Sequence, residues 1–155
     1  MILRAENIQK SYGELSILRG VNLEIKQNEI VSIVGASGAG KTTFLQILGT
    51  LDKPSSGNLV IDGENPFHLN ETQLSSFRNT SLGFIFQFHQ LLPEFTACEN
   101  IMLPALIKGL NKKDAEEQAI SLLEKVGLQD RIKHKPSELS GGEQQRTAVC
   151  RALMN

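Results

Sequence analysis

The sequence predicts an α/β fold, with strands in its first part and a helical subdomain in its second part. Val21–Ile25 alternates apolar and polar residues with period two, as a half-buried strand does. Ile30–Val34 is a continuous apolar run, which is typical of a strand covered on both faces in a parallel sheet. Past Gln87 the apolar residues recur mainly at helical spacing.

Further elements follow from local patterns. Strands are expected at Met1–Lys10, Asn58–Ile61 and Leu82–Phe86, and the turn dipeptide Asp62-Gly63 follows the second of them. Helical character begins at Lys41 and continues to Leu48. The residues expected to cap later helices are Asn70 (to about Arg78), Thr96 with Glu99 (towards Lys108), Asn111 and Ser140, and Gly127 is expected to end the Asn111 helix.

Composition narrows the class of protein. The 155 residues are enough for one domain with a buried core, and the net charge of −1 argues against binding nucleic acid through phosphate neutralisation. No apolar run approaches the ~18 residues that span a bilayer, and Met1–Glu6 lacks the layout of a signal peptide. Cys98 and Cys150 lack metal-ligand spacing, so we interpret both as reduced thiols that pack in the interior.

A glycine-rich segment lies between the predicted strand at Ile30–Val34 and the helix that begins at Lys41. It satisfies the pattern G-x-x-x-x-G-K-[ST], and its residues are Gly35, Ala36, Ser37, Gly38, Ala39, Gly40, Lys41 and Thr42. The glycines let successive N–H groups face inward as a nest for phosphate oxygens, and the helix N-terminus points at the same anion. Lys41 adds a positive charge for the β- and γ-phosphates, and the Thr42 hydroxyl is a ligand for the Mg²⁺ that bridges them. ATP and Mg²⁺ are therefore the expected ligands, against the plainer interpretation of a glycine-rich turn with a solvated lysine.

A second glycine motif, Leu139–Gln144, opens the last predicted helix. Ser140 and Glu143 have the spacing of a capping box. Gly141 and Gly142 leave the first amides of this helix bare, which makes a second anion site with the Ser140 hydroxyl as an extra donor. Alone, the motif fits an ordinary capped helix equally well.

A chain that carries both motifs resembles the ABC ATPase family, in which L-S-G-G-[EQ]-Q is the signature sequence. The resemblance covers the whole chain. It implies a P-loop NTPase fold, namely an ABC-type ATPase core with a parallel sheet, an N-terminal antiparallel β part and a helical subdomain. The implied parts are a nucleotide core over about 1–87, a helical subdomain over about 88–140, and a signature helix over about 140–155.

The resemblance also implies roles for single residues. Tyr12 stands where the family places an aromatic residue that stacks on adenine, and Thr43 lies next to the phosphates. Gln87 matches the Q-loop glutamine, which the family uses near Mg²⁺ and to sense the membrane partner. Lys41 and Gln87 are thus the expected catalytic residues, and Thr42 and Gln87 the expected metal-binding ones. Taken alone, Tyr12 also fits a half-buried strand end, and Gln87 a polar strand terminus.

The family pairs two such domains head to tail. The resemblance therefore implies that Ser140, Gly141 and Gly142 act on the γ-phosphate of ATP held by a second ABC ATPase domain. It also implies integral membrane transporter subunits as partners and a peripheral location on the cytoplasmic face of the inner membrane. The stretch Phe86–Asn100 is similar to the lipoprotein-releasing branch, and neighbouring export branches share most of it. We expect some of Phe88, Leu91, Leu92 and Phe95 to form a groove for a membrane subunit, although all four also fit a plain core.

The family places an apolar run followed by Asp-Glu after the signature helix. The Asp holds Mg²⁺ through its hydration shell and the Glu orients the attacking water. The sequence stops at Asn155, before that point, and Asp62-Gly63 is a turn rather than a substitute. We therefore expect a fragment, missing the C-terminal part of the core, that binds nucleotide better than it hydrolyses it.

Other functions stay open at this point. A soluble ABC ATPase that acts on nucleic acid or ribosomes would usually carry long inserted arms or basic tracts, and the sequence has neither. A P-loop kinase would lack the signature motif. A non-catalytic nucleotide-binding fragment remains an alternative. The cargo of a transporter is determined in a separate membrane subunit.

Overall fold

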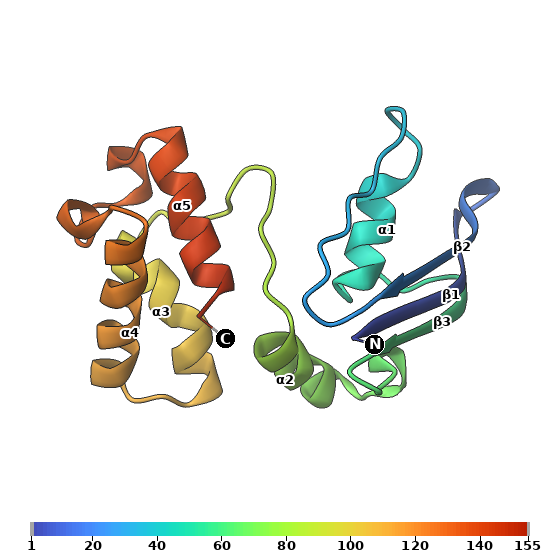
Figure 1. Ribbon diagram of the computed structural model, residues 1–155, viewed down its shortest axis with the longest axis horizontal. Coiled ribbons are helices and arrows are strands. Elements are labelled where there is room, and N and C mark those ends of the chain that lie inside the picture. The colour runs from blue at the N-terminus through green and yellow to red at the C-terminus, as the bar shows by residue number, and fades with distance from the viewer. Residues whose placement is uncertain (1, 155) are drawn as a thin grey trace. The chain divides into compact units, whose positions relative to one another are not determined.

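The computed structural model describes residues 2–154, and the chain divides into two compact units (Figure 1). The first unit is Met1–Ser75 and the second is Ser76–Asn155. The boundary falls within helix α2, Glu71–Ser81. The sequence-based division into three parts stays a prediction.

The first unit contains a three-stranded antiparallel sheet. Its strands are β1 (Leu3–Tyr12), β2 (Leu15–Ile25) and β3 (Ser56–Ile61), in the order β2-β1-β3. Asp62 and Gly63 both have positive φ and link Ile61 to Glu64 through a pair of backbone hydrogen bonds, which confirms the predicted turn. The N-terminal antiparallel β part is therefore confirmed. Helix α1, Lys41–Leu48, begins within the glycine-rich segment and has the bounds that the sequence predicts.

Two predicted strands are wrong. Glu29–Val34 forms no strand, and Ile30 and Val34 are 98% and 85% exposed. Leu82–Phe86 is also irregular. A strand needs a neighbour to complete its backbone hydrogen bonds, and within residues 2–154 no strand pairs with either segment. The expected parallel sheet is accordingly not formed in this part of the chain.

The second unit is helical. After α2 come α3 (Ala97–Lys108), α4 (Lys112–Lys125) and α5 (Gly141–Ala152), with short 3-10 helices at Gln129–Arg131 and Pro136–Glu138. A further 3-10 helix, Pro66–His68, precedes α2 in the first unit. The predicted caps are confirmed: the side chains of Asn70, Thr96, Asn111 and Ser140 accept backbone N–H groups of their helices. Gly127 follows α4 with φ of 71°.

One apolar core holds α3, α4 and α5 together. Its fully buried side chains include Ile101, Leu123 and Leu128. Cys98 and Cys150 are free and lie in the same core, as predicted for packing thiols. Burial raises the pKa of the Cys98 thiol to about 11, so this thiol stays protonated at neutral pH.

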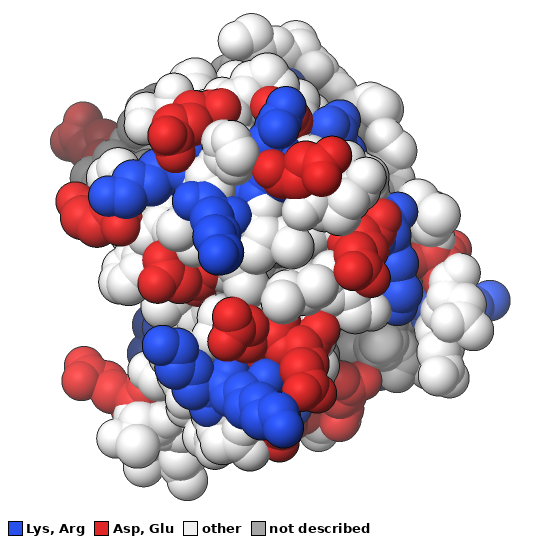
Figure 2. All heavy atoms as spheres, turned by 90° about the vertical axis from the view of Figure 1, so that its left-hand side faces the viewer, with Lys and Arg blue, Asp and Glu red and all other residues white. Residues whose placement is uncertain are grey.

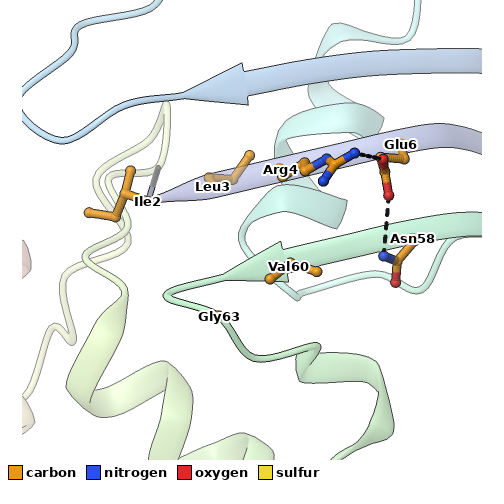
Figure 3. Close-up of a pocket in the computed structure, with 7 residues that line it drawn as sticks. All are labelled: Ile2, Leu3, Arg4, Glu6, Asn58, Val60 and Gly63. Atoms are coloured by element: carbon orange, nitrogen blue, oxygen red, sulfur yellow. Dashed lines mark hydrogen bonds and ion pairs between the residues drawn. The ribbon is translucent and has the colours of Figure 1, made fainter.

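The surface shows two further features. A shallow pocket of about 280 Å³ lies beside β1 and β3 (Figure 3). Its polar side chains satisfy one another, since Arg4 pairs with Glu6 and Asn58 Nδ2 lies 3.5 Å from Glu6 Oε2. On the face in Figure 2, basic and acidic side chains are intermixed without a large area of one sign. None of the helices formed by residues 2–154 is long and apolar enough to cross a bilayer.

Candidate phosphate-binding site

The N-terminus of α1 is open to a ligand. The helix begins after Gly40, which has no side chain to cap the first amides, and no side-chain cap is present. These amides carry the positive end of the helix dipole. Ser37, Gly38 and Thr42 are exposed, so an anion can approach from solvent. This helix terminus therefore suits an anionic group.

Two of the three glycines are required by the backbone. Gly38 and Gly40 have φ of 78° and 85°, in the left-handed region that other residues rarely adopt. A Cβ atom on Gly40 would also lie 2.8 Å from Cδ2 of Leu18 on β2. Gly35 has neither constraint, since a Cβ there meets only ordinary contacts.

Lys41 is folded back over the loop. Its Nζ donates to the carbonyl oxygens of Gly35, at 2.9 Å, and Ala36, at 2.6 Å. An ammonium has three donors, so one remains for a phosphate oxygen. The Thr42 hydroxyl is exposed and makes no hydrogen bond within residues 2–154. Uncapped amides, a lysine and a free hydroxyl are the donor set that a nucleotide phosphate with Mg²⁺ requires, and the site fits both.

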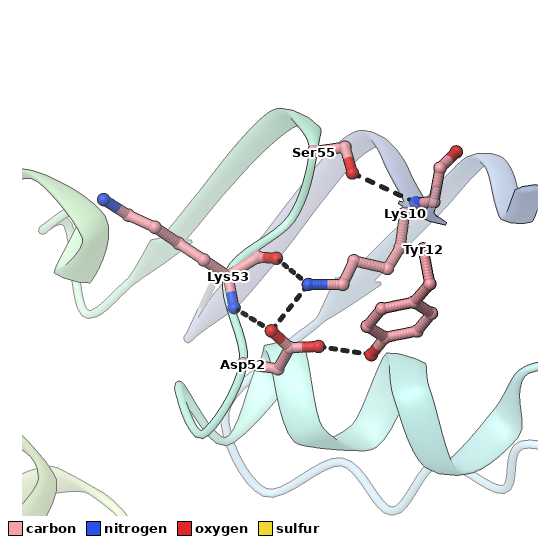
Figure 4. A network of polar contacts seen from close by, with 6 residues as sticks. Lys10, Tyr12, Asp52, Lys53 and Ser55 are labelled. Carbon is pink, nitrogen blue, oxygen red and sulfur yellow. Dashed lines mark hydrogen bonds and ion pairs between the residues drawn. The ribbon is translucent and has the colours of Figure 1, made fainter. Parts of the chain in front are cut away.

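Tyr12 lies at the last position of β1, just before the turn residue Gly13, and is 51% exposed. Its hydroxyl donates to Asp52 Oδ2 at 2.6 Å, while Lys10 Nζ lies 4.8 Å from the ring centroid (Figure 4). The hydrogen bond to Asp52 is the main reason why the pKa of Tyr12 is raised. The aromatic ring is thus held in place but remains accessible.

Gln87 lies in the second unit, in an exposed turn. The turn is closed by the hydrogen bond from His89 N to Phe86 O, and His89 and Gln90 both have positive φ. Arg151 of α5 donates to the carbonyl oxygens of His89 at 2.8 Å and Gln90 at 2.7 Å. This arginine therefore fixes the segment after Gln87 to the end of the signature helix.

The signature segment is a well-formed helix N-terminus. Ser140 N donates to Glu143 Oε2 at 2.7 Å, and Glu143 N lies 3.4 Å from Ser140 Oγ. Arg131 Nε donates to Glu143 Oε1 at 2.9 Å and orients this carboxylate from outside the helix. The Ser140 hydroxyl therefore takes part in the capping box itself, through both the backbone N–H and the carboxylate of Glu143.

Asn100, which no sequence motif singles out, is fully buried in α3. Its Oδ1 accepts from Leu92 N, and its Nδ2 donates to the carbonyl oxygens of Leu92, Phe95 and Thr96 at 3.0–3.1 Å. One side chain thus fixes the loop that presents Phe95. The available signal was an asparagine directly before the apolar run Ile101–Leu103 of α3, because a buried amide needs partners.

Comparisons with known proteins agree on one family. Residues 18–155 match the family model described as ABC transporter. The chain is 58% identical over 154 residues to the lipoprotein-releasing system ATP-binding protein LolD of Bacteroides thetaiotaomicron, covering 99% of this chain and 71% of that protein. It is 61% identical over 155 residues to the LolD protein of Porphyromonas gingivalis, covering all of this chain and 71% of that protein.

Solved structures give the same result for the fold. The chain matches the dimeric structure of the ATP-binding cassette MJ0796 in a post-hydrolysis state bound to ADP and Pi, with a TM-score of 0.91 and 40% identity. This match covers 99% of the chain and 70% of the cassette. A second dimeric structure of MJ0796, a bacterial ABC transporter cassette, gives a TM-score of 0.92 at the same identity.

The capping carboxylate of α5 predicts a pH dependence. The hydrogen bonds from Ser140, and after them the one from Arg131, lower the pKa of Glu143 to about 2 from 4.5. A lowered folded-state pKa means that the charged group stabilises the fold above about pH 4.5 and loses this effect as the pH falls through about 2. The stability difference between the native chain and Glu143→Gln, measured by urea unfolding, should be largest above about pH 5 and shrink towards pH 2.

Glu117→Gln is the matched control, because the Glu117 side chain is 67% exposed and lies 4.0 Å from Lys113 on the surface of α4. Its effect on the free energy of unfolding should be small at every pH. A pH-independent difference for Glu143→Gln would contradict the assigned role of the carboxylate.

Proposed function

Since this chain belongs to the ABC transporter family, we propose that it is the ATP-binding subunit of a lipoprotein-releasing ABC transporter. In this role it couples ATP binding and hydrolysis to the release of lipoproteins from a membrane. The observation that carries the proposal is the uncapped phosphate loop at α1 in a chain that also has a signature helix N-terminus at α5. The identity of 58–61% to LolD proteins supports the lipoprotein-releasing branch.

The residues of the phosphate loop hold the triphosphate of ATP. The amides from Gly38 to Thr42 donate to phosphate oxygens, and Lys41 Nζ exchanges part of its carbonyl contacts for the β- and γ-phosphates. Mg²⁺, when bound, would neutralise the developing phosphate charge, and the Thr42 hydroxyl is its proposed ligand in the first unit. A role for Gln87 near Mg²⁺ stays a prediction. Thr43 lies beside the same phosphates, and the Tyr12 ring stacks on adenine.

The signature glycines support a second ATPase domain as the partner. A Cβ on Gly141 would meet nothing within 4 Å, and on Gly142 it would meet only Arg146 Nη1 at 3.7 Å. Neither glycine has a positive φ. Glycine loses more conformational entropy on folding than alanine does, so a requirement outside this helix is a reason to keep it at the first two positions of α5. Close approach of the γ-phosphate of a second, head-to-tail domain is such a requirement.

The membrane partner is proposed to dock where apolar side chains follow Gln87. Phe88 is 81% exposed, and Leu92 and Phe95 are 42% and 38% exposed. Large apolar side chains at the surface mark sites of interaction when they lie close together. With such a partner, we propose a peripheral location at the cytoplasmic face of the inner membrane.

Lys41→Ala should abolish ATP binding, because the loop then loses its only lysine for the phosphates. Isothermal titration of the native protein and of Lys41→Ala with ATP and Mg²⁺ measures the loss of affinity. Lys53→Ala is the matched control, since only the backbone of Lys53 takes part in the contacts near Tyr12. ATP affinity at the native level in Lys41→Ala would overturn the proposed site.

Gly142→Ala should stabilise the isolated protein and weaken its function. Alanine fits the space and lowers the entropy of the unfolded chain, so the free energy of unfolding should rise by about 0.4–1 kcal/mol. ATP-dependent dimerisation, measured by sedimentation, should fall. Gly127→Ala is the control that must destabilise, because Gly127 has φ of 71°. Unchanged dimerisation in Gly142→Ala would contradict a role in trans.

Phe95→Ala tests the membrane surface. We expect it to reduce assembly with the membrane subunits and coupled ATPase activity, while ATP binding by the free subunit stays unchanged. Co-purification from detergent and ATPase assays in vesicles measure both effects. Ile107→Ala, at a position 73% exposed on α3, is the matched apolar control. Intact assembly and coupling in Phe95→Ala would remove Phe95 from the proposed surface.

A further inference from the structure

Two charged residues, Lys10 and Asp52, both contact the side chain of Tyr12. Lys10 lies on the same strand, β1, and Asp52 lies after α1, 42 residues further along the chain. Lys10 Nζ donates to Asp52 Oδ1 at 2.6 Å, and the other oxygen of Asp52 accepts the Tyr12 hydroxyl at 2.6 Å. Figure 4 shows the carboxylate between the ammonium and the phenol oxygen. The three side chains therefore form one connected network.

The ammonium of Lys10 is fully used by this network. Lys10 is only 9% exposed, which is uncommon for a lysine unless the charge has partners. Besides Asp52, Nζ donates to the carbonyl oxygen of Lys53 at 2.7 Å, and it lies 4.8 Å from the centroid of the Tyr12 ring. The ammonium and the ring thus make a cation–π contact on one face of the ring.

This arrangement makes the two faces of the ring unequal. Lys10 covers one face, while the tyrosine as a whole remains 51% exposed. The hydrogen bond from the hydroxyl to Asp52 fixes the ring plane, so the ring does not have to be ordered when a planar ligand arrives. A cation on one face also draws electron density away from the other, which favours an electron-rich base there.

We propose that Lys10 and Asp52 are positioning residues that set the Tyr12 ring to receive a purine base on its free face. The inference rests on the proposed function, because it concerns the ring that stacks on adenine there. Neither residue touches the base. Lys10 acts on the face of the ring that it covers, and Asp52 acts through the hydrogen bond that it accepts from the Tyr12 hydroxyl. The hydrogen bond from Lys10 is the main reason why the pKa of the Asp52 carboxyl is lowered.

A plain structural role predicts a different result. The Lys10–Asp52 pair also ties β1 to the segment between α1 and β3, so its loss can lower stability. The loss of a contact that only stabilises the fold lowers the affinity of the first unit for all its ligands by the same factor. Positioning of the ring affects only ligands that carry a base, and inorganic tripolyphosphate carries none.

The test compares ATP with tripolyphosphate in the native protein and in Lys10→Met, Asp52→Asn and Tyr12→Phe, by isothermal titration at constant Mg²⁺. Each variant should bind ATP about threefold to tenfold more weakly, with tripolyphosphate affinity unchanged. Lys53→Met, which alters only an outward-pointing side chain, should bind both ligands as the native protein does (Figure 4). Thermal unfolding of each variant without ligand measures the structural effect separately.

Two outcomes overturn the inference. Native ATP affinity in Lys10→Met and Asp52→Asn excludes positioning, and an equal loss for ATP and tripolyphosphate assigns the pair a structural role only. Tyr12→Ala separates this failure from that of the proposed function. If Tyr12→Ala weakens ATP binding but the positioning variants do not, the adenine site stands and only the inference falls. If Tyr12→Ala also binds ATP normally, the adenine site itself is wrong.

Discussion

The uncapped N-terminus of α1 is the constraint on which the candidate site depends. Each of the other α-helices satisfies one of its first amides with a side chain of its own, from Asn70, Thr96, Asn111 or Ser140. At α1 the corresponding residue is Gly40, and it offers no acceptor. Backbone amides strongly require a partner, so in this helix water or an anion must supply it. The position of Lys41, folded over the same loop, makes the anion the better partner.

Local chemistry predicted the helices well because their caps depend on neighbours in sequence. A Thr96 hydroxyl and a Glu99 carboxylate three residues away find each other without help from the rest of the chain. Strands differ, because Ile30–Val34 needs partners that are distant in sequence, and within residues 2–154 it has none. The apolar pattern predicts burial of this segment, but pattern alone does not supply the neighbouring strands, and Ile30 and Val34 are exposed.

The contacts that the sequence did not reveal share one property, namely long separation. Lys10 and Asp52 are 42 residues apart, and Arg151 reaches His89 across 62 residues. Nothing in the local sequence around Asp52 distinguishes it from the other carboxylates of the chain. Asn100 is a partial exception, because its contacts lie within eight residues and its apolar surroundings already required partners for its amide. The local sequence thus predicts groups that would contact a ligand, and the structure adds long-range contacts that hold some of these groups.

The two glycine motifs also differ in the reason why glycine is needed at their positions. In the phosphate loop, Gly38 and Gly40 are demanded by positive φ, and Gly40 by the approach of Leu18 as well. In the signature segment, nothing in the described chain crowds Gly141 or requires an unusual backbone there, and the same holds almost entirely for Gly142. Alanine at these two positions would restrict the unfolded chain more than glycine does, so the presence of glycine is consistent with the proposed contact in trans. The first motif is thus explained by its own loop, whereas the second is explained by the partner proposed above.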